Sequence, residues 1–115
     1  MGFLANVFAK ATGTAEAVDV AEAQRRQQAG ALIVDVRESE EWREGHVAGA
    51  THIPLGSLAT RCAELPRDRE LLTMCRSGNR SARAQTLLQG QGFTAVRNVS
   101  GGVTAWERAG LPVQR

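Results

Sequence analysis

Residues 71–90 read LLTMCRSGNRSARAQTLLQG and decide the fold. The apolar run Leu71–Met74 predicts a buried strand, and residues 81–89 predict a helix with one apolar face. The polar loop 75–80 joins them, with a cysteine at its start and a glycine in its middle. A buried strand that leads through a short loop into a helix is the repeating unit of a parallel α/β sheet.

Strands and helices alternate along the rest of the chain. Apolar runs predict strands at 32–36, 50–54 and 94–99, and periodic patterns predict helices at 21–29, 57–65 and 102–109. Asp19, with Glu22 three residues on, is predicted to cap the first helix, and Ser39 is predicted to cap an acidic turn at 40–44. The pattern predicts an α/β domain with a mainly parallel sheet and helices on both faces. We place this domain at residues 16–115, after an N-terminal tail at 1–15 that carries a short apolar stripe.

Composition excludes several classes of protein. The chain has 115 residues, of which 43% are hydrophobic and 23% charged, as in a single globular domain. A net charge of +2 and few aromatic residues argue against a nucleic-acid partner. No apolar run is long enough to span a membrane and the N-terminus lacks a basic leader, so we expect a cytoplasmic protein.

The two cysteines are predicted to have different roles. They fit neither a disulfide scaffold nor a zinc motif with His46 and His52, so no metal is expected. Cys62 falls on the apolar stripe of its predicted helix, which favours packing over a resolving thiol. Cys75 follows a buried strand and precedes a helix N-terminus, where backbone N–H groups and the helix dipole stabilise a thiolate. We therefore predict that Cys75 is a nucleophile.

The loop around Cys75 predicts a site for an anion. Arg76 and Arg80 add two cations, and Gly78 permits the backbone angles that let amides converge on one point. Further hydrogen-bond donors of the loop are Ser77, Asn79 and Ser81.

Four stretches, taken in order, resemble the rhodanese, or sulfurtransferase, domain. They are DVRE (35–38), EWREGHVAGATHIP (41–54), CRSGNRS (75–81) and GGVTAW (101–106), and the resemblance spans about residues 18–112. It implies a five-stranded parallel sheet, a persulfide on Cys75, an active-site loop from Arg76 to Arg80 and no cofactor. Four residues separate Cys75 from Arg80, as in sulfurtransferases, whereas the related phosphatases and arsenate reductases have five.

The resemblance implies transfer of a sulfane sulfur from a small anion such as thiosulfate to cyanide, a cellular thiol or a protein. Arg76 is expected to dock the donor. One alternative is a persulfide carrier that delivers sulfur to a protein partner, and a less favoured alternative is a phosphatase or arsenate reductase.

Residues outside the loop are expected to support it. Asp35 and Arg37 end the neighbouring strand, so either could pair with a loop charge, and the resemblance suggests that Asp35 or Glu38 holds Arg80. Direct contact between Arg80 and the anion is the rival interpretation. The remaining expectations are a solvated Arg83, structural hydrogen bonds for His46 and His52, and core positions for Trp42 and Trp106.

Overall fold

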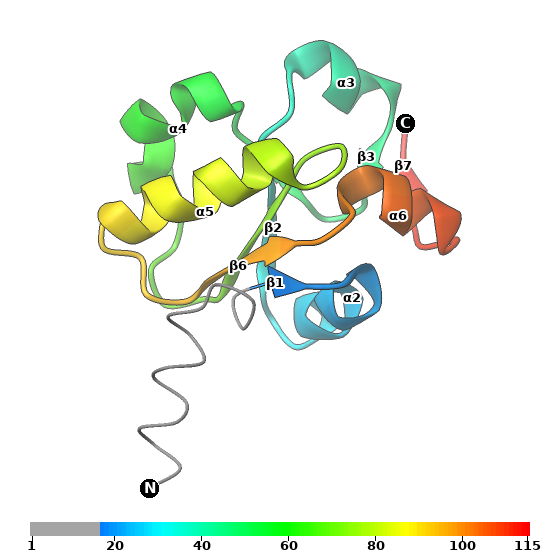
Figure 1. Cartoon of the computed structure of the whole chain (residues 1–115), viewed down its shortest axis with the longest axis horizontal. Coiled ribbons are helices and arrows are strands. Elements are labelled where there is room, and N and C mark those ends of the chain that lie inside the picture. Colours follow the sequence, from blue (N-terminus) through cyan, green and yellow to red (C-terminus); the bar gives the residue numbers. More distant parts are fainter. Residues whose placement is uncertain (1–16) are drawn as a thin grey trace, which may run out of the picture.

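The computed structural model describes residues 17–115, so the predicted tail at 1–15 lies outside the described residues, as does its apolar stripe of Phe3, Leu4, Val7 and Phe8 (Figure 1). The strands are β1 (Ala17–Val18), β2 (Leu32–Asp35), β3 (His46–Val47), β4 (Thr51–His52), β5 (Leu71–Met74), β6 (Val96–Val99) and β7 (Val113–Gln114). The helices are α2 (Val20–Gln28), α3 (Ser39–Glu44), α4 (Leu55–Arg61), the 3₁₀ turn η2 (Cys62–Glu64), α5 (Asn79–Gly90) and α6 (Gly102–Arg108).

Five strands form one parallel sheet in the order β1-β6-β5-β2-β4, which confirms the predicted fold class. The central strand is β5, flanked by β2 and β6, and its Thr73 pairs in register with Val34 and Asn98. A second, antiparallel pair joins β3 to β7 and was not predicted. Since every strand of the main sheet runs the same way, the loop after β5 lies at the edge where parallel sheets bind ligands.

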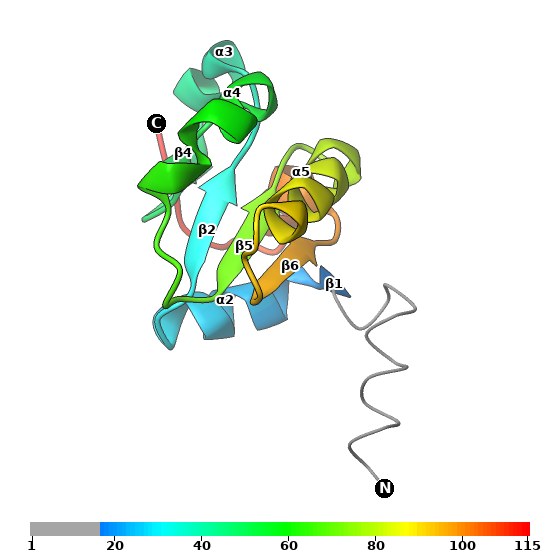
Figure 2. The same cartoon turned by 90° about the vertical axis from the view of Figure 1, so that its left-hand side faces the viewer.

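Helices cover both faces of the sheet, with α4 and α5 on one side and α2 and α6 on the other (Figures 1 and 2). Successive residues of a strand point to opposite faces, so Leu71 packs into the first layer and Leu72 into the second. Cys62 packs in the first layer and Trp106 in the second, both as predicted. No helix within residues 17–115 is long and apolar enough to cross a membrane.

Three helix starts show what capping does in this chain. The carboxylate of Asp19 accepts the Glu22 N–H at 2.9 Å, as predicted for the first helix. Glu38, and not Ser39, caps α3, because its side chain and that of Glu41 form a reciprocal capping box. The helix after the loop starts at Asn79, two residues before the predicted start, with Gly78 as its N-cap.

Candidate active site

Cys75 lies at the carboxyl end of the central strand and is 1% exposed. The backbone N–H of Gly78 donates to its sulfur at 3.1 Å, and the hydroxyl oxygen of Ser81 lies 3.4 Å from the same atom. Gly78 has φ 120°, a left-handed conformation that a side chain disfavours. The loop therefore folds back over the sulfur of Cys75, its first residue.

The surroundings of Cys75 favour its anionic form. Burial alone raises the pKa of the thiol, but hydrogen bonds from the Ser81 hydroxyl and from the backbone N–H groups of Ser81, Gly78 and Ser77 outweigh burial, so the pKa is lowered. The thiolate is the nucleophilic form of cysteine. This chemistry is what the loop sequence predicts.

The start of α6 orients the loop from behind. The N–H of Val103 donates to the carbonyl of Cys75 at 2.8 Å, and the N–H of Thr104 donates to the carbonyl of Arg76 at 3.1 Å. Gly102 has φ 54°, and a Cβ built on it would lie 2.3 Å from the Cys75 carbonyl oxygen. The backbone of α6 can approach the loop this closely only because residue 102 is glycine. The carbonyl groups of Cys75 and Arg76 point toward α6 as a result.

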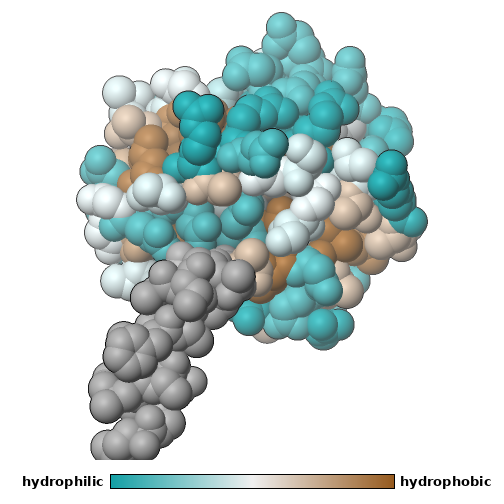
Figure 3. Space-filling view, in the orientation of Figure 1, coloured by the Kyte–Doolittle hydropathy of each residue, from teal (hydrophilic) through white to brown (hydrophobic). Residues whose placement is uncertain are grey.

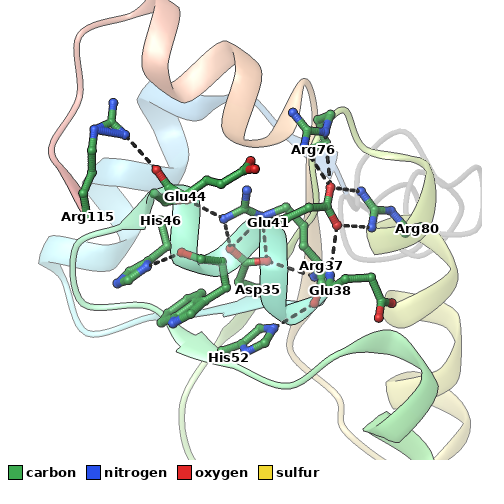
Figure 4. Close-up of polar contacts among 12 residues, drawn as sticks. Asp35, Arg37, Glu38, Glu41, Glu44, His46, His52, Arg76, Arg80 and Arg115 are labelled. Atoms are coloured by element: carbon green, nitrogen blue, oxygen red, sulfur yellow. Dashed lines mark hydrogen bonds and ion pairs between the residues drawn. The ribbon is translucent and has the colours of Figure 1, made fainter.

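A single carboxylate holds both arginines of the loop (Figure 4). Arg80 donates to the two oxygens of Glu41 at 2.7 and 2.9 Å, and Arg76 donates to Oε2 at 3.2 Å. The pairing with Arg80 lowers the pKa of Glu41 to about 2 although burial opposes it. The expectation that Asp35 or Glu38 holds Arg80 was therefore wrong, because the third residue of α3 reaches the loop.

Asp35 and Arg37 pair with each other and not with the loop. Arg37 donates to the Asp35 carboxylate at 2.8 and 3.0 Å and to the carbonyl of Gly45 at 2.8 Å. Both side chains are buried, and a buried ion pair needs such additional hydrogen bonds. The pair fixes the connection from β2 to α3, which carries Glu41, so its support for the loop is indirect.

The two histidines make the structural hydrogen bonds that were expected. His46 Nδ1 lies 2.9 Å from the Trp42 carbonyl oxygen, and His52 Nε2 lies 2.7 Å from the Arg37 carbonyl oxygen. Trp42 is half-buried rather than a core residue, because its indole stacks on the imidazoles of His46 and His52, at centroid separations of 3.5 and 4.8 Å.

A groove of about 460 Å³ adjoins the loop between α4 and α5. Its lining residues are Glu38, Leu55, Gly56, Arg80, Arg83 and Leu87. Arg83 is exposed there, as are Ser77 and Asn79 on the loop itself. The surface over α3 and the adjoining end of α5 is strongly hydrophilic (Figure 3). Residues 17–115 contain no cluster of three or more His, Cys, Asp or Glu side chains that could hold a metal ion.

Sequence reasoning overlooked three residues of this site. Glu41 had a usable signal, since Glu38 and Glu41 have capping-box spacing and one end of that box faces the loop. Gly102 had a weaker signal, a double glycine at a predicted helix start. Asn98 bonds both Ser81 and Gly78, and its only signal is a polar residue within a strand.

The ion pairs of Glu41 with Arg76 and Arg80, called the Glu41 clamp below, are expected to make the stability of the fold depend on pH. Because the folded-state pKa of Glu41 is about 2 and its ordinary value 4.5, the contribution is complete above pH 4.5 and is lost as the pH falls toward 2. Glu41→Gln should lower the free energy of unfolding by about 1–2 kcal/mol at pH 7, and by progressively less toward pH 3. Urea unfolding across this range measures the difference.

The matched control for this prediction is Glu64→Gln. Glu64 also accepts from an arginine, Arg61, but both side chains are about half exposed, and such pairs contribute little. Equal effects of the two substitutions at pH 7 would show that the clamp is an ordinary surface ion pair.

Comparison with known proteins agrees with this geometry. The family model described as "Rhodanese-like domain" matches residues 19–109. The chain is 40% identical to a sulfurtransferase of Allochromatium vinosum over 71% of its own length and 77% of the relative's. It is 38% identical to the thiosulfate sulfurtransferase GlpE of Pseudomonas putida, over 77% of its own length and 80% of the relative's.

A third relative and a solved structure extend the comparison. The chain is 43% identical to a putative sulfur carrier protein, YrkF, of Bacillus subtilis, over 64% of its own length but only 40% of the relative's. The crystal structure of a rhodanese-related protein from Thermoplasma volcanium superposes with a TM-score of 0.80 at 31% identity, covering 86% of this chain and 97% of that one. The chain belongs to the rhodanese-like sulfurtransferase family.

Proposed function

We propose that this protein transfers a sulfane sulfur from a thiosulfate-like donor to a thiophilic acceptor through a persulfide on Cys75. The observation that carries the proposal is the sulfur atom at the floor of a loop whose N–H and O–H donors converge on it. The donor class is supported by the thiosulfate sulfurtransferase relative.

The first step loads the cysteine. The Cys75 thiolate attacks the outer sulfur of thiosulfate, a sulfur–sulfur bond forms, and the bond to the sulfite sulfur breaks. The electron pair of that bond leaves with sulfite, so a monoanion and a dianion give a persulfide anion and a dianion. The guanidinium of Arg76 is exposed and shares Glu41 with Arg80, and we assign it the binding of the donor and of the departing sulfite. Arg80 donates to both oxygens of Glu41 and is assigned to holding the loop.

The second step unloads it. Cyanide, or the thiolate of an acceptor, attacks the outer sulfur of the persulfide, and the Cys75 thiolate is the leaving group. With cyanide the products are thiocyanate and the free enzyme. The loop donors that stabilise the thiolate therefore act on the leaving group of this step.

The alternative of a persulfide carrier is supported by the Bacillus subtilis relative named as a sulfur carrier. A carrier would load with sulfur but turn over slowly with cyanide or small thiols, so steady-state kinetics with several acceptors separate the two functions. A phosphatase or arsenate reductase is less well supported, because the loop is one residue shorter than theirs. A cytoplasmic location stays a prediction.

The proposal is tested by mass spectrometry after treatment with thiosulfate. We expect the protein to gain the mass of one sulfur atom, carried by the peptide with Cys75 and not by the one with Cys62, and to lose it on addition of cyanide. A protein that gains no sulfur, or gains it on Cys62, would refute the mechanism.

A further inference from the structure

The hydroxyl group of Ser81 has one hydrogen and three acceptors within reach. Its oxygen lies 2.6 Å from Oδ1 of Asn98, 3.2 Å from the carbonyl oxygen of Gly78 and 3.4 Å from the sulfur of Cys75. Ser81 is fully buried, so water does not supply a fourth partner. The side chain can therefore donate to only one of these atoms at a time.

The orientation of Asn98 decides where that hydrogen lies. Its amide Nδ2 donates to the Gly78 carbonyl at 3.2 Å, and the reverse orientation of the amide would set two oxygen atoms against each other. Oδ1 must therefore face Ser81. The Gly78 carbonyl already accepts from Asn98 and from the N–H of Ala82 at 3.1 Å. Asn98 Oδ1, at the shortest of the three distances, is therefore the preferred acceptor of the Ser81 hydroxyl.

We propose that Asn98 is a positioning residue for the Ser81 hydroxyl. Asn98 Oδ1 accepts the hydrogen bond of this hydroxyl while the Cys75 sulfur is uncharged, and the hydroxyl turns to donate to the sulfur when the sulfur becomes a thiolate. A neutral thiol leaves the Ser81–Asn98 bond intact. A thiolate is the stronger acceptor, and the hydroxyl rotates to donate to it, which costs the bond to Asn98. The amide of Asn98 therefore sets how readily Cys75 becomes anionic.

The inference also bears on the persulfide, a part that rests on the proposed function. Once the outer sulfur is attached, the negative charge resides there and the inner sulfur is uncharged. The Ser81 hydrogen then returns to Asn98, and it is available again when the inner sulfur leaves as a thiolate. The Ser81 hydroxyl would in this way alternate between donating to Asn98 and donating to the Cys75 sulfur in each catalytic cycle.

The test is the pH dependence of Cys75 alkylation by iodoacetamide, with Cys62 replaced by alanine so that one thiol reacts. Asn98→Asp has nearly the same shape and offers the Ser81 hydroxyl a charged, stronger acceptor, although it also loses the Nδ2 hydrogen bond to the Gly78 carbonyl. We expect the midpoint of the profile to rise by about one pH unit, so that alkylation at a pH below the midpoint slows about tenfold. The other charged groups of the site, Arg76, Arg80 and Glu41, are unchanged in this variant.

Replacing Ser81 with alanine separates the hydrogen bond from the added charge. In the Ser81→Ala background, Asn98→Asp should shift the midpoint by less than half as much, because only the added charge and the lost bond to Gly78 act. Ser100→Asp, which adds the same charge at an exposed position two residues along, should also give the smaller shift.

Equal shifts with and without the Ser81 hydroxyl would overturn the proposal. Asn98→Ala, a second variant without a new charge, is expected to change the midpoint only when Ser81 is present, and a change that persists in Ser81→Ala would likewise overturn it. Alkylation uses no sulfur donor, so this result stands apart from whether the protein transfers sulfur.

Discussion

Replacing Cys75 with serine should abolish sulfur transfer, lowering turnover from thiosulfate to cyanide by at least about a thousandfold. The site stabilises a thiolate with the Gly78 N–H and the Ser81 hydroxyl, and a serine hydroxyl stays protonated in the same surroundings. It also offers no sulfur on which a persulfide can form. The rate of thiocyanate formation measures the loss.

The control for this substitution is the other cysteine. Cys62 is buried in the core layer on the side of α4 and α5, and its sulfur donates a hydrogen bond to the carbonyl of Ala59 in the preceding helix α4. Cys62→Ala should cost some stability through lost packing and leave turnover within about twofold of the parent. Retention of transfer in Cys75→Ser, or its loss in Cys62→Ala, would reassign the nucleophile.

The second large effect is expected from Gly102→Ala, which should lower the free energy of unfolding by about 2–4 kcal/mol. Its methyl group would lie 2.3 Å from the Cys75 carbonyl oxygen and 2.6 Å from that of Arg76, so α6 or the loop must move. A displaced α6 loses the N–H bonds of Val103 and Thr104 to those carbonyl groups. We therefore expect a large loss of transfer activity in the protein that still folds.

Gly110→Ala is the matched control. Gly110 also has a positive φ, of 72°, but a Cβ there meets no atom within 4 Å. It should cost about 1 kcal/mol from backbone strain alone and leave activity intact. Thermal unfolding and initial rates of both variants give the comparison. If Gly102→Ala lost no more stability than Gly110→Ala, the packing of α6 on the loop would not limit the fold.

Local patterns predicted four of the five strands of the main sheet, all but β1, and most of its helices, because much of the necessary information is local. The buried strand Leu71–Met74 has the predicted bounds, and the cap at Asp19 was identified by its residue type and spacing. The start of α5 differs from its predicted position because the backbone conformation of a single residue determines it. Gly78 starts α5 two residues early because its positive φ ends the loop there.

The supporting residues of the site were harder to predict because they depend on tertiary contacts. The family resemblance suggested Asp35 or Glu38 as the partner of Arg80, but Asp35 pairs with Arg37 and the carboxylate that binds Arg80 belongs to Glu41 on α3. Asn98 lies beside Thr73 across the sheet, a register that no local pattern of either strand specifies. Cys75, the nucleophile that we propose, could be singled out from the sequence because its loop, its cations and its helix are contiguous.

The order of synthesis gives the α6 contact a further consequence. Gly102, Val103 and Thr104 follow Cys75 in the chain, so a growing polypeptide carries the cysteine before it carries the groups of α6 that orient the loop. Until those residues leave the ribosome and fold, the carbonyl groups of Cys75 and Arg76 lack the N–H groups of α6, and we expect the loop to be less ordered around the Cys75 sulfur. The geometry of the candidate site is therefore completed only when α6 has been made.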